Sequence, residues 1–188
     1  MLFRETVRTD LQRFAEMSKG PLSKATIGLL FHPRVFPVVL IRLAAKLHSL
    51  GLGRMANTVA LINMMIFRIE VPARCAIGRG FMLPHPGGTV LGSASIGSNV
   101  TIFQNVTLGA RHFDPDYDLS RRPILQDRVT VGAGAVILGP VTIGEGATVA
   151  ANSLVLADVP PGATAMGVPA VNSYRASKNS DVAVSDSN

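Results

Sequence analysis

A six-residue spacing of aliphatic side chains dominates the second half of this 188-residue chain. The spacing is interrupted once and then resumes, and a small or β-branched residue follows most of the aliphatic residues four positions later. The aliphatic positions are Val90, Ile96, Ile102 and Leu108, and then Leu125, Val131, Ile137, Ile143, Val149 and Val155. A period of six indicates a short strand and a tight turn, and three such units close a triangular coil of about 18 residues. The pattern predicts a parallel β-helix of about four coils, with the aliphatic side chains stacked inside.

The interruption lies at residues 111–123, which are mostly polar and include Asp114, Asp116 and Asp118. Such a segment cannot continue the coil, so we expect a protruding loop. Loops of this length inserted in a regular solenoid are usually functional.

The residues before the repeat have a different pattern. Apolar residues recur there at helical spacing, and Pro and Gly separate the segments, which predicts three or four helices up to about Phe67. We therefore divide the chain into an N-terminal helical part (1–69), a β-helix (70–171) and a tail (172–188). The tail is rich in Ser, Asn, Asp and Ala, and we expect it to be disordered.

The charge is unevenly distributed. Residues 1–79 contain 12 Lys/Arg and 4 Asp/Glu, whereas residues 80–188 contain 6 and 8. The basic residues could lie on solvated helix faces, or they could contact a membrane surface peripherally. This part of the chain lacks interleaved aromatic residues that would stack on bases, so we expect no nucleic-acid partner. The longest apolar run, 59–67, is too short to span a bilayer. With no secretory signal and one cysteine, Cys75, a soluble cytoplasmic protein is expected.

Three motifs accompany the repeat. Residues 83–88 read LPHPGG, residues 104–109 read QNVTLG, and the segment 159–170 begins VPPG and ends GVPA. Together with the helical part, these motifs resemble the serine O-acetyltransferase family of acetyl-CoA-dependent hexapeptide transferases. The resemblance runs from about Leu29 to Ala170. It implies a left-handed β-helix, which is an exception to the usual right-handed crossover, and a homotrimer with active sites between neighbouring β-helices.

By this resemblance, His85 occupies the position of the family's catalytic base, and Glu70 that of the aspartate that orients the base. A hydroxyl is a poor nucleophile near pH 7 until a base takes its proton, and imidazole suits that task. A carboxylate on the second ring nitrogen would fix the tautomer. The alternatives are a turn histidine that only packs and a solvated glutamate. We expect a direct ternary complex without an acetyl-enzyme, because Cys75 has no histidine beside it in sequence.

The donor is expected to be acetyl-CoA, which the resemblance places in a groove between two β-helices. Gly109, Ala110, Ala133 and Ala151 match the family's small residues there, although small residues also serve the turns of any coil. We expect no metal, because only His85 and one other histidine fall in the repeat region and a three-histidine zinc site would be incomplete.

The acceptor site departs from the family pattern. Arg121 matches the arginine implicated in holding the carboxylate of serine. However, Pro84 and Gly20 stand where the family has two acidic residues. Arg122 stands where the family has a histidine, and His112 could take over the role of that histidine. An ammonium group without an acceptor or a counter-charge is costly to bury. We therefore expect a sugar of a surface polysaccharide or glycolipid as acceptor, bound by Arg121, Arg122 and His112.

Two alternatives remain open from the sequence. One is acetylation of L-serine for cysteine synthesis, and the other is a catalytically silent trimeric β-helix scaffold. The chain lacks the terminal isoleucine by which the family's serine enzymes dock into cysteine synthase, so we expect no such docking.

Overall fold

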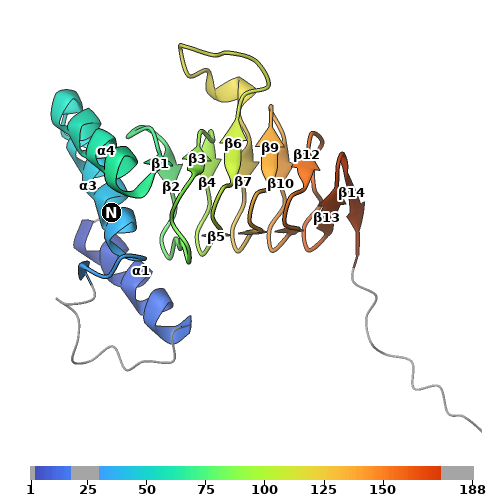
Figure 1. The fold of residues 1–188 in the computed structure, drawn as a ribbon, viewed down its shortest axis with the longest axis horizontal. Helices are drawn as coiled ribbons and strands as arrows, with labels where there is room; N and C mark the ends of the chain where they lie inside the picture. The colour runs from blue at the N-terminus through green and yellow to red at the C-terminus, as the bar shows by residue number, and fades with distance from the viewer. Residues whose placement is uncertain (1–2, 18–29, 175–188) are drawn as a thin grey trace, which may run out of the picture.

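The computed structural model describes residues 3–17 and 30–174, which form a helical part followed by a β-helix (Figure 1). The helices are α1 (Phe3–Met17), α3 (Phe36–Ser49) and α4 (Gly53–Phe67). A short 3-10 helix, η2 (Leu119–Arg121), lies in the protruding loop. The strands are β1 (Ile69–Glu70), β2 (Ala76–Ile77), β3 (Thr89–Leu91), β4 (Ser95–Ile96), β5 (Thr101–Ile102), β6 (Thr107–Gly109), β7 (Ile124–Leu125), β8 (Thr130–Val131), β9 (Val136–Leu138), β10 (Thr142–Ile143), β11 (Thr148–Val149), β12 (Leu154–Val155), β13 (Thr164–Gly167) and β14 (Ala170–Ser173).

The strands form three sheets, one on each side of a triangular coil. Their orders are β1-β3-β6-β9-β12, β2-β4-β7-β10 and β5-β8-β11-β13-β14, and every pairing is parallel except β13 with β14. Val131 pairs with Val149 in the next coil, which is the separation that three units of the repeat predict. Ile102 pairs with Val131 across the protruding loop, so the loop is inserted without changing the register of the coil.

The interior of the coil contains the predicted aliphatic column, with one correction. Nine of the ten predicted residues are buried, but Val90 is only half-buried, and its neighbour Leu91 is fully buried instead. Leu91 pairs with Leu108, so this coil is shorter than the repeat by a single position. Counting back in sixes from Ile96 therefore assigns the wrong residue to the interior.

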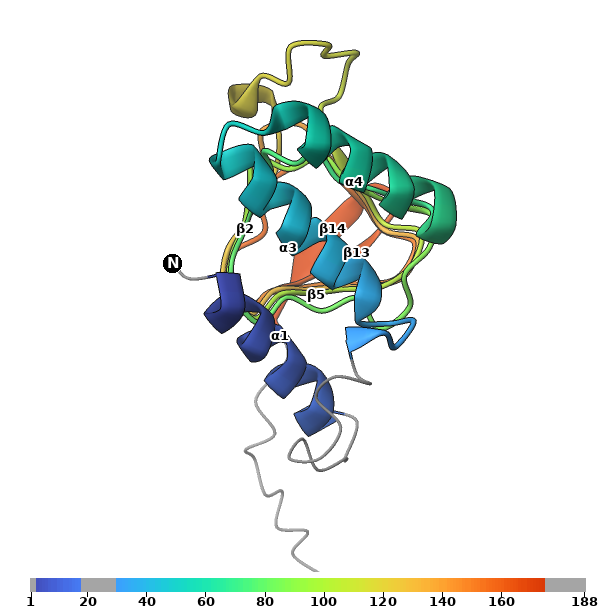
Figure 2. The same ribbon diagram turned by 90° about the vertical axis from the view of Figure 1, so that its left-hand side faces the viewer.

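The helices α1, α3 and α4 lie at the N-terminal end of the β-helix (Figure 2). Asp10 of α1 and Arg42 of α3 form a buried ion pair with an Nε–Oδ2 distance of 2.8 Å, and Asp10 also accepts a hydrogen bond from the backbone N–H of Phe81. The Arg42 guanidinium donates to the carbonyls of Ile77 and Gly78 on the first coil. Burial raises the pKa of Asp10. Breaking such a pair by removing one partner typically costs about 3–5 kcal/mol.

A second arginine fastens α1 to the coil. Arg13 donates hydrogen bonds to the carbonyls of Gly80 and Val100, and to the hydroxyl of Thr101 at 2.8 Å. The carbonyl of Val100 also accepts from the backbone N–H of Met82. The carbonyls of Ile77, Gly78 and Gly80 lie on the first coil, which has no coil before it, and the two arginines supply them with donors.

The last helix ends at Phe67, and β1 begins at Ile69. At the other end, β14 continues to Ser173, past residue 172, where we expected the tail to begin. Residues 175–188, which make up most of that tail, and Gly20 lie outside the described residues. No helix within 3–17 and 30–174 is both long and apolar enough to cross a membrane.

The close stacking of turns predicts a strong effect of a small substitution at Gly132. A Cβ atom there would lie 2.6 Å from the backbone nitrogen of Ala151 in the next coil. We expect Gly132→Ala to cost about 1–3 kcal/mol of unfolding free energy, which lowers Tm by roughly 3–9 °C for a chain of this size. Gly53→Ala is the matched control, since nothing lies within 4 Å of its Cβ position. Equal Tm values for the two variants by circular dichroism would contradict this stacking.

Candidate active site

His85 lies in the turn that precedes β3, and its side chain is exposed. Leu83, at the start of the LPHPGG motif, is fully buried and fixes the beginning of the turn in the core. The imidazole lies beside the ring of Phe103, with the two ring centroids 6.4 Å apart. It borders an open hollow of about 410 Å³, whose lining also includes Arg68, Pro86, Gly87, Gly88, Gln104 and Asn105. A small substrate can therefore reach the imidazole directly from solvent.

The first two sequence motifs stack on each other at this corner of the coil. Asn105 donates its backbone N–H to the carbonyl of Gly87 at 3.0 Å. Gly88 has a φ of +65°, and a Cβ atom there would lie 2.1 Å from the side-chain oxygen of Asn105. A side chain at this position would be strained by the backbone angle and would displace the amide of Asn105, which gives a physical reason for the second Gly of LPHPGG.

Gln104 is a site residue whose individual role the sequence analysis did not identify. It lines the hollow beside His85, and its Oε1 atom is buried without a hydrogen-bond partner among the described residues. Buried polar atoms are nearly always paired, so an unpaired one at a hollow indicates a place for a donor from outside the chain. Its presence in the quoted QNVTLG motif was the only signal available in the sequence.

Glu70 ends β1 and is exposed, with its Cα paired to that of Val90. Within the described chain no hydrogen bond joins its carboxylate to His85. The orienting contact expected from the sequence is therefore not formed in the single chain.

Arg122 has partners other than the expected substrate. Its side chain is only 9% exposed, and its Nη2 atom lies 2.6 Å from Oδ2 of Asp114. Nη1 donates to the carbonyl of Gly92 at 3.0 Å, and the guanidinium stacks on the ring of Tyr117. The charge of Arg122 is thus neutralised inside the loop, which argues against the expected free cation for an acceptor.

The other two loop residues expected to bind the acceptor are exposed. Arg121 has 63% of its side chain exposed and pairs with Asp118 at 3.2 Å, and His112 is also exposed. Neither lines the hollow beside His85. The loop emerges at the end of β6 (Figure 1). His85 precedes the neighbouring parallel strand β3 and therefore lies at the opposite end of this strand pair, so one chain does not bring these residues together.

The four small residues expected to contact acetyl-CoA divide between two corners. Gly109 and Ala110 lie where the loop leaves the coil. Ala133 and Ala151 lie in turns of later coils on the corner of His85, where the carbonyl of Gln104 accepts from Gly134 and that of Ala133 accepts from Asn152. A line of stacked turns with small side chains therefore runs along the coil from the hollow beside His85.

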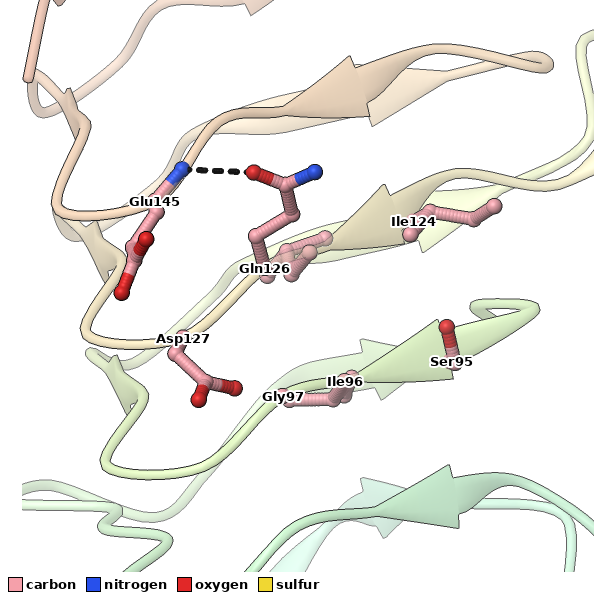
Figure 3. Close-up of a pocket in the computed structure, with 8 residues that line it drawn as sticks. Ser95, Ile96, Gly97, Ile124, Gln126, Asp127 and Glu145 are labelled. Carbon is pink, nitrogen blue, oxygen red and sulfur yellow. Dashed lines mark hydrogen bonds between the residues drawn. The ribbon is translucent and has the colours of Figure 1, made fainter. Parts of the chain in front are cut away.

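A second hollow, of about 450 Å³, lies on another corner of the coil (Figure 3). Gln126 accepts a hydrogen bond from the backbone N–H of Glu145 there, and Asp127 accepts one from the backbone N–H of Ser98. Glu145 is itself paired with Arg128. These polar groups are engaged in contacts between successive coils, and no histidine lines this hollow.

Cys75 is buried beneath the loop, and its Sγ atom lies 3.7 Å from the carbonyl oxygen of Ser93. Burial raises the pKa of this thiol to about 11, so it is protonated at neutral pH. Across residues 3–17 and 30–174, no group of three or more His, Cys, Asp or Glu side chains is arranged to hold a metal ion.

The protonation of Cys75 predicts slow labelling. At pH 8 we expect the native thiol to react with Ellman's reagent on the order of 100-fold more slowly than the thiol of the denatured chain, because the thiolate is the reactive form. The native rate should keep rising about tenfold per pH unit up to about pH 11, whereas the rate of the denatured chain should level off above about pH 9. Fast labelling of the folded protein at pH 8 would show that the thiol is accessible and ionised.

The comparisons with known proteins agree on one family. The family described as Bacterial transferase hexapeptide (six repeats) matches residues 122–157. A serine acetyltransferase of Helicobacter pylori is 37% identical over 143 residues, which cover 76% of this chain and 82% of the relative. The serine acetyltransferase of Neisseria gonorrhoeae has a similar structure, with a TM-score of 0.81, 30% identity, and coverage of 94% of this chain and 68% of that one.

Two ligand complexes are also similar in structure. A soybean serine acetyltransferase complexed with serine has a TM-score of 0.80 and 34% identity, with coverage of 91% of this chain and 69% of that one. A serine acetyltransferase in complex with CoA has a TM-score of 0.78 and 29% identity, with coverage of 91% and 69%. The predicted left-handed β-helix with a helical N-terminal part is confirmed by these similarities.

Proposed function

Because the chain belongs to the serine acetyltransferase family of hexapeptide transferases, we propose that it transfers an acetyl group from acetyl-CoA to the side-chain hydroxyl of L-serine. The chain is an acetyl-CoA-dependent acyltransferase. The observation that carries the proposal is the similarity to serine acetyltransferases over most of the length of both chains, with His85 exposed in an open hollow.

We propose L-serine in place of the sugar that we expected from the sequence. The relatives are named for serine, so the comparisons favour the alternative from the sequence analysis over its main interpretation. One argument for a sugar was the additional positive charge of Arg122, and that charge is paired with Asp114 in the structure. Arg121 remains exposed for the carboxylate of serine, and the unpaired Oε1 of Gln104 supplies an acceptor for its ammonium group.

In the proposed step, His85 acts as the general base. A ring nitrogen takes the proton of the hydroxyl while the hydroxyl oxygen attacks the thioester carbonyl. The tetrahedral intermediate collapses with cleavage of the C–S bond, and the imidazolium returns the proton to the departing CoA thiolate. Backbone N–H groups of the coil stabilise the oxyanion, and Glu70 orients the imidazole once the assembly is complete.

The assembly we propose is a homotrimer, and the outer faces of the coil support this. Half-buried or exposed apolar side chains predominate on the outside of the sheet β1-β3-β6-β9-β12. The outer face of β2-β4-β7-β10 is mixed, with Ser95 and Thr142 beside Ala76 and Ile124, and Thr predominates on the strands β5, β8, β11 and β13. The apolar residues of the sheet β1-β3-β6-β9-β12 are Val90, Val136, Leu138, Leu154 and Leu156. If neighbouring copies cover this face around a three-fold axis, the loop corner of one copy meets the His85 corner of the next.

The same arrangement brings together the groups that one chain keeps apart. Arg121 and His112 of one copy would then approach the hollow beside His85 of its neighbour. Gly109 and Ala110 of one copy would face Ala133 and Ala151 of the other, and acetyl-CoA would lie between them.

Loss of the base predicts loss of turnover. We expect His85→Ala to lower kcat by about 100-fold or more, measured as CoA release with L-serine, while light scattering shows an unchanged trimer. His48→Ala, which removes an exposed histidine at the end of α3, is the matched control and should keep wild-type kcat. Near-normal turnover by His85→Ala would remove this residue from the mechanism, and turnover of sugars without turnover of L-serine would overturn the acceptor.

The apolar face predicts how the trimer can be broken. We expect Leu154→Glu to dissociate the trimer in light scattering, because a carboxylate would be buried without a partner on the covered face. Thr142→Glu places the same charge on the sheet β2-β4-β7-β10 and should leave the trimer intact. A stable trimer of Leu154→Glu would show that another face is covered.

A further inference from the structure

The protruding loop is attached to the coil at its base by buried polar contacts. Arg122 donates through Nε and Nη2 to Oδ2 of Asp114, at 3.0 and 2.6 Å, and through Nη1 to the carbonyl of Gly92. The side chains of Arg122 and Asp114 are 9% and 4% exposed. The first and last parts of the loop are thus joined to each other and to the coil.

Tyr117 forms the centre of this base. Its hydroxyl donates to the carbonyl of Ser93 at 2.8 Å, and the guanidinium carbons of Arg122 and Arg74 lie 3.6 and 4.9 Å from its ring centroid. Burial raises the pKa of Tyr117, so the hydroxyl keeps the proton that it donates. Its φ of +55° is uncommon for a residue other than glycine, and such a conformation persists only where surrounding contacts determine it.

From this base the contacts continue to Arg121. Oδ1 of Asp114 accepts from the backbone N–H of Asp118, and Oδ1 of Asp118 accepts from the backbone N–H of Ser120 at the start of η2. The backbone N–H of Arg121 donates to the carbonyl of Asp118. The Asp118 N–H and the Arg122 guanidinium hold the pKa of Asp114 below its usual range, so it is ionised at neutral pH. The backbone of Arg121 is therefore held from both sides, while its guanidinium stays exposed.

We propose that Asp114, Tyr117 and Arg122 are positioning residues that hold Arg121 in place for the carboxylate of the acceptor. This inference rests on the proposed function. A guanidinium recognises a carboxylate through two parallel hydrogen bonds, which requires a defined position. A loop that must be ordered at the moment of binding weakens affinity, whereas a loop already fixed does not. The exposed ion pair of Arg121 with Asp118 is weak enough to be exchanged for a substrate.

The test compares two acceptors, L-serine and L-serinamide, which keeps the hydroxyl and the amino group but lacks the carboxylate. We expect Asp114→Ala to raise the KM of L-serine by about tenfold or more, and Tyr117→Phe to raise it by about threefold. The KM of acetyl-CoA, kcat, and the kinetics with L-serinamide should stay within about twofold of wild type, because none of them uses Arg121. Asp116→Ala, an exposed acid in the same loop, should change none of these values.

Two further measurements separate positioning from a general structural effect. In the background of Arg121→Ala, Asp114→Ala should have no further effect on the KM of L-serine, since the group that it positions is gone. Hydrogen exchange at the amides of Arg121 and Arg122 should become faster in Asp114→Ala and stay unchanged in Asp116→Ala.

The outcomes distinguish the two proposals. No turnover of L-serine by the wild-type protein would overturn the proposed function and this inference with it. Wild-type turnover with an unchanged KM in Asp114→Ala would overturn this inference alone. Equal losses with L-serine and L-serinamide would do so too, since they would show that the contacts only maintain the fold.

Discussion

Hydrogen bonds between successive coils are the interaction on which the rest of this structure depends. Each strand is only two to four residues long, so no strand is stable without the coils on either side. The first coil has no coil before it, and the helical part supplies donors to its carbonyls through Arg42 and Arg13, with Asp10 compensating the buried charge of Arg42. The helices therefore belong to the β-helix energetically, although they differ from it in pattern and composition.

Stacking also explains how the candidate site is formed from short motifs. The turns at one corner lie directly over one another, so that His85, Gln104 and Ala133 follow in order along one edge although they are distant in sequence. The six-residue period was sufficient to predict this architecture, because each of its three units per coil returns to the same side. It failed at Val90, where a coil shorter by a single position moves Leu91 to the interior. A local change of this kind leaves no periodic signal in a single coil.

The loop shows where prediction from sequence ends. Its position and its protrusion followed from the break in the repeat, but the partners of Arg122 did not. Asp114 and Tyr117 are separated from Arg122 by irregular chain, and no spacing rule indicates that the three side chains meet. The motif alignment assigned Arg122 to the substrate by its position, whereas its burial and its neutralised charge depend on tertiary contacts. Gln104 is the converse, because the sequence analysis gave it no individual role and the structure places it at the site. Its unpaired oxygen becomes evident only when the turns are stacked.

The antiparallel pairing of β14 with β13 has a consequence for how this architecture can change over time. Parallel stacking cannot continue past a strand that runs in the opposite direction, and the helices block it at the other end, so fibre-like growth along the axis is prevented. Between these two closed ends, whole coils could be gained or lost in evolution without rebuilding either end, so the length of the groove is free to vary while the chemistry at its corner is retained.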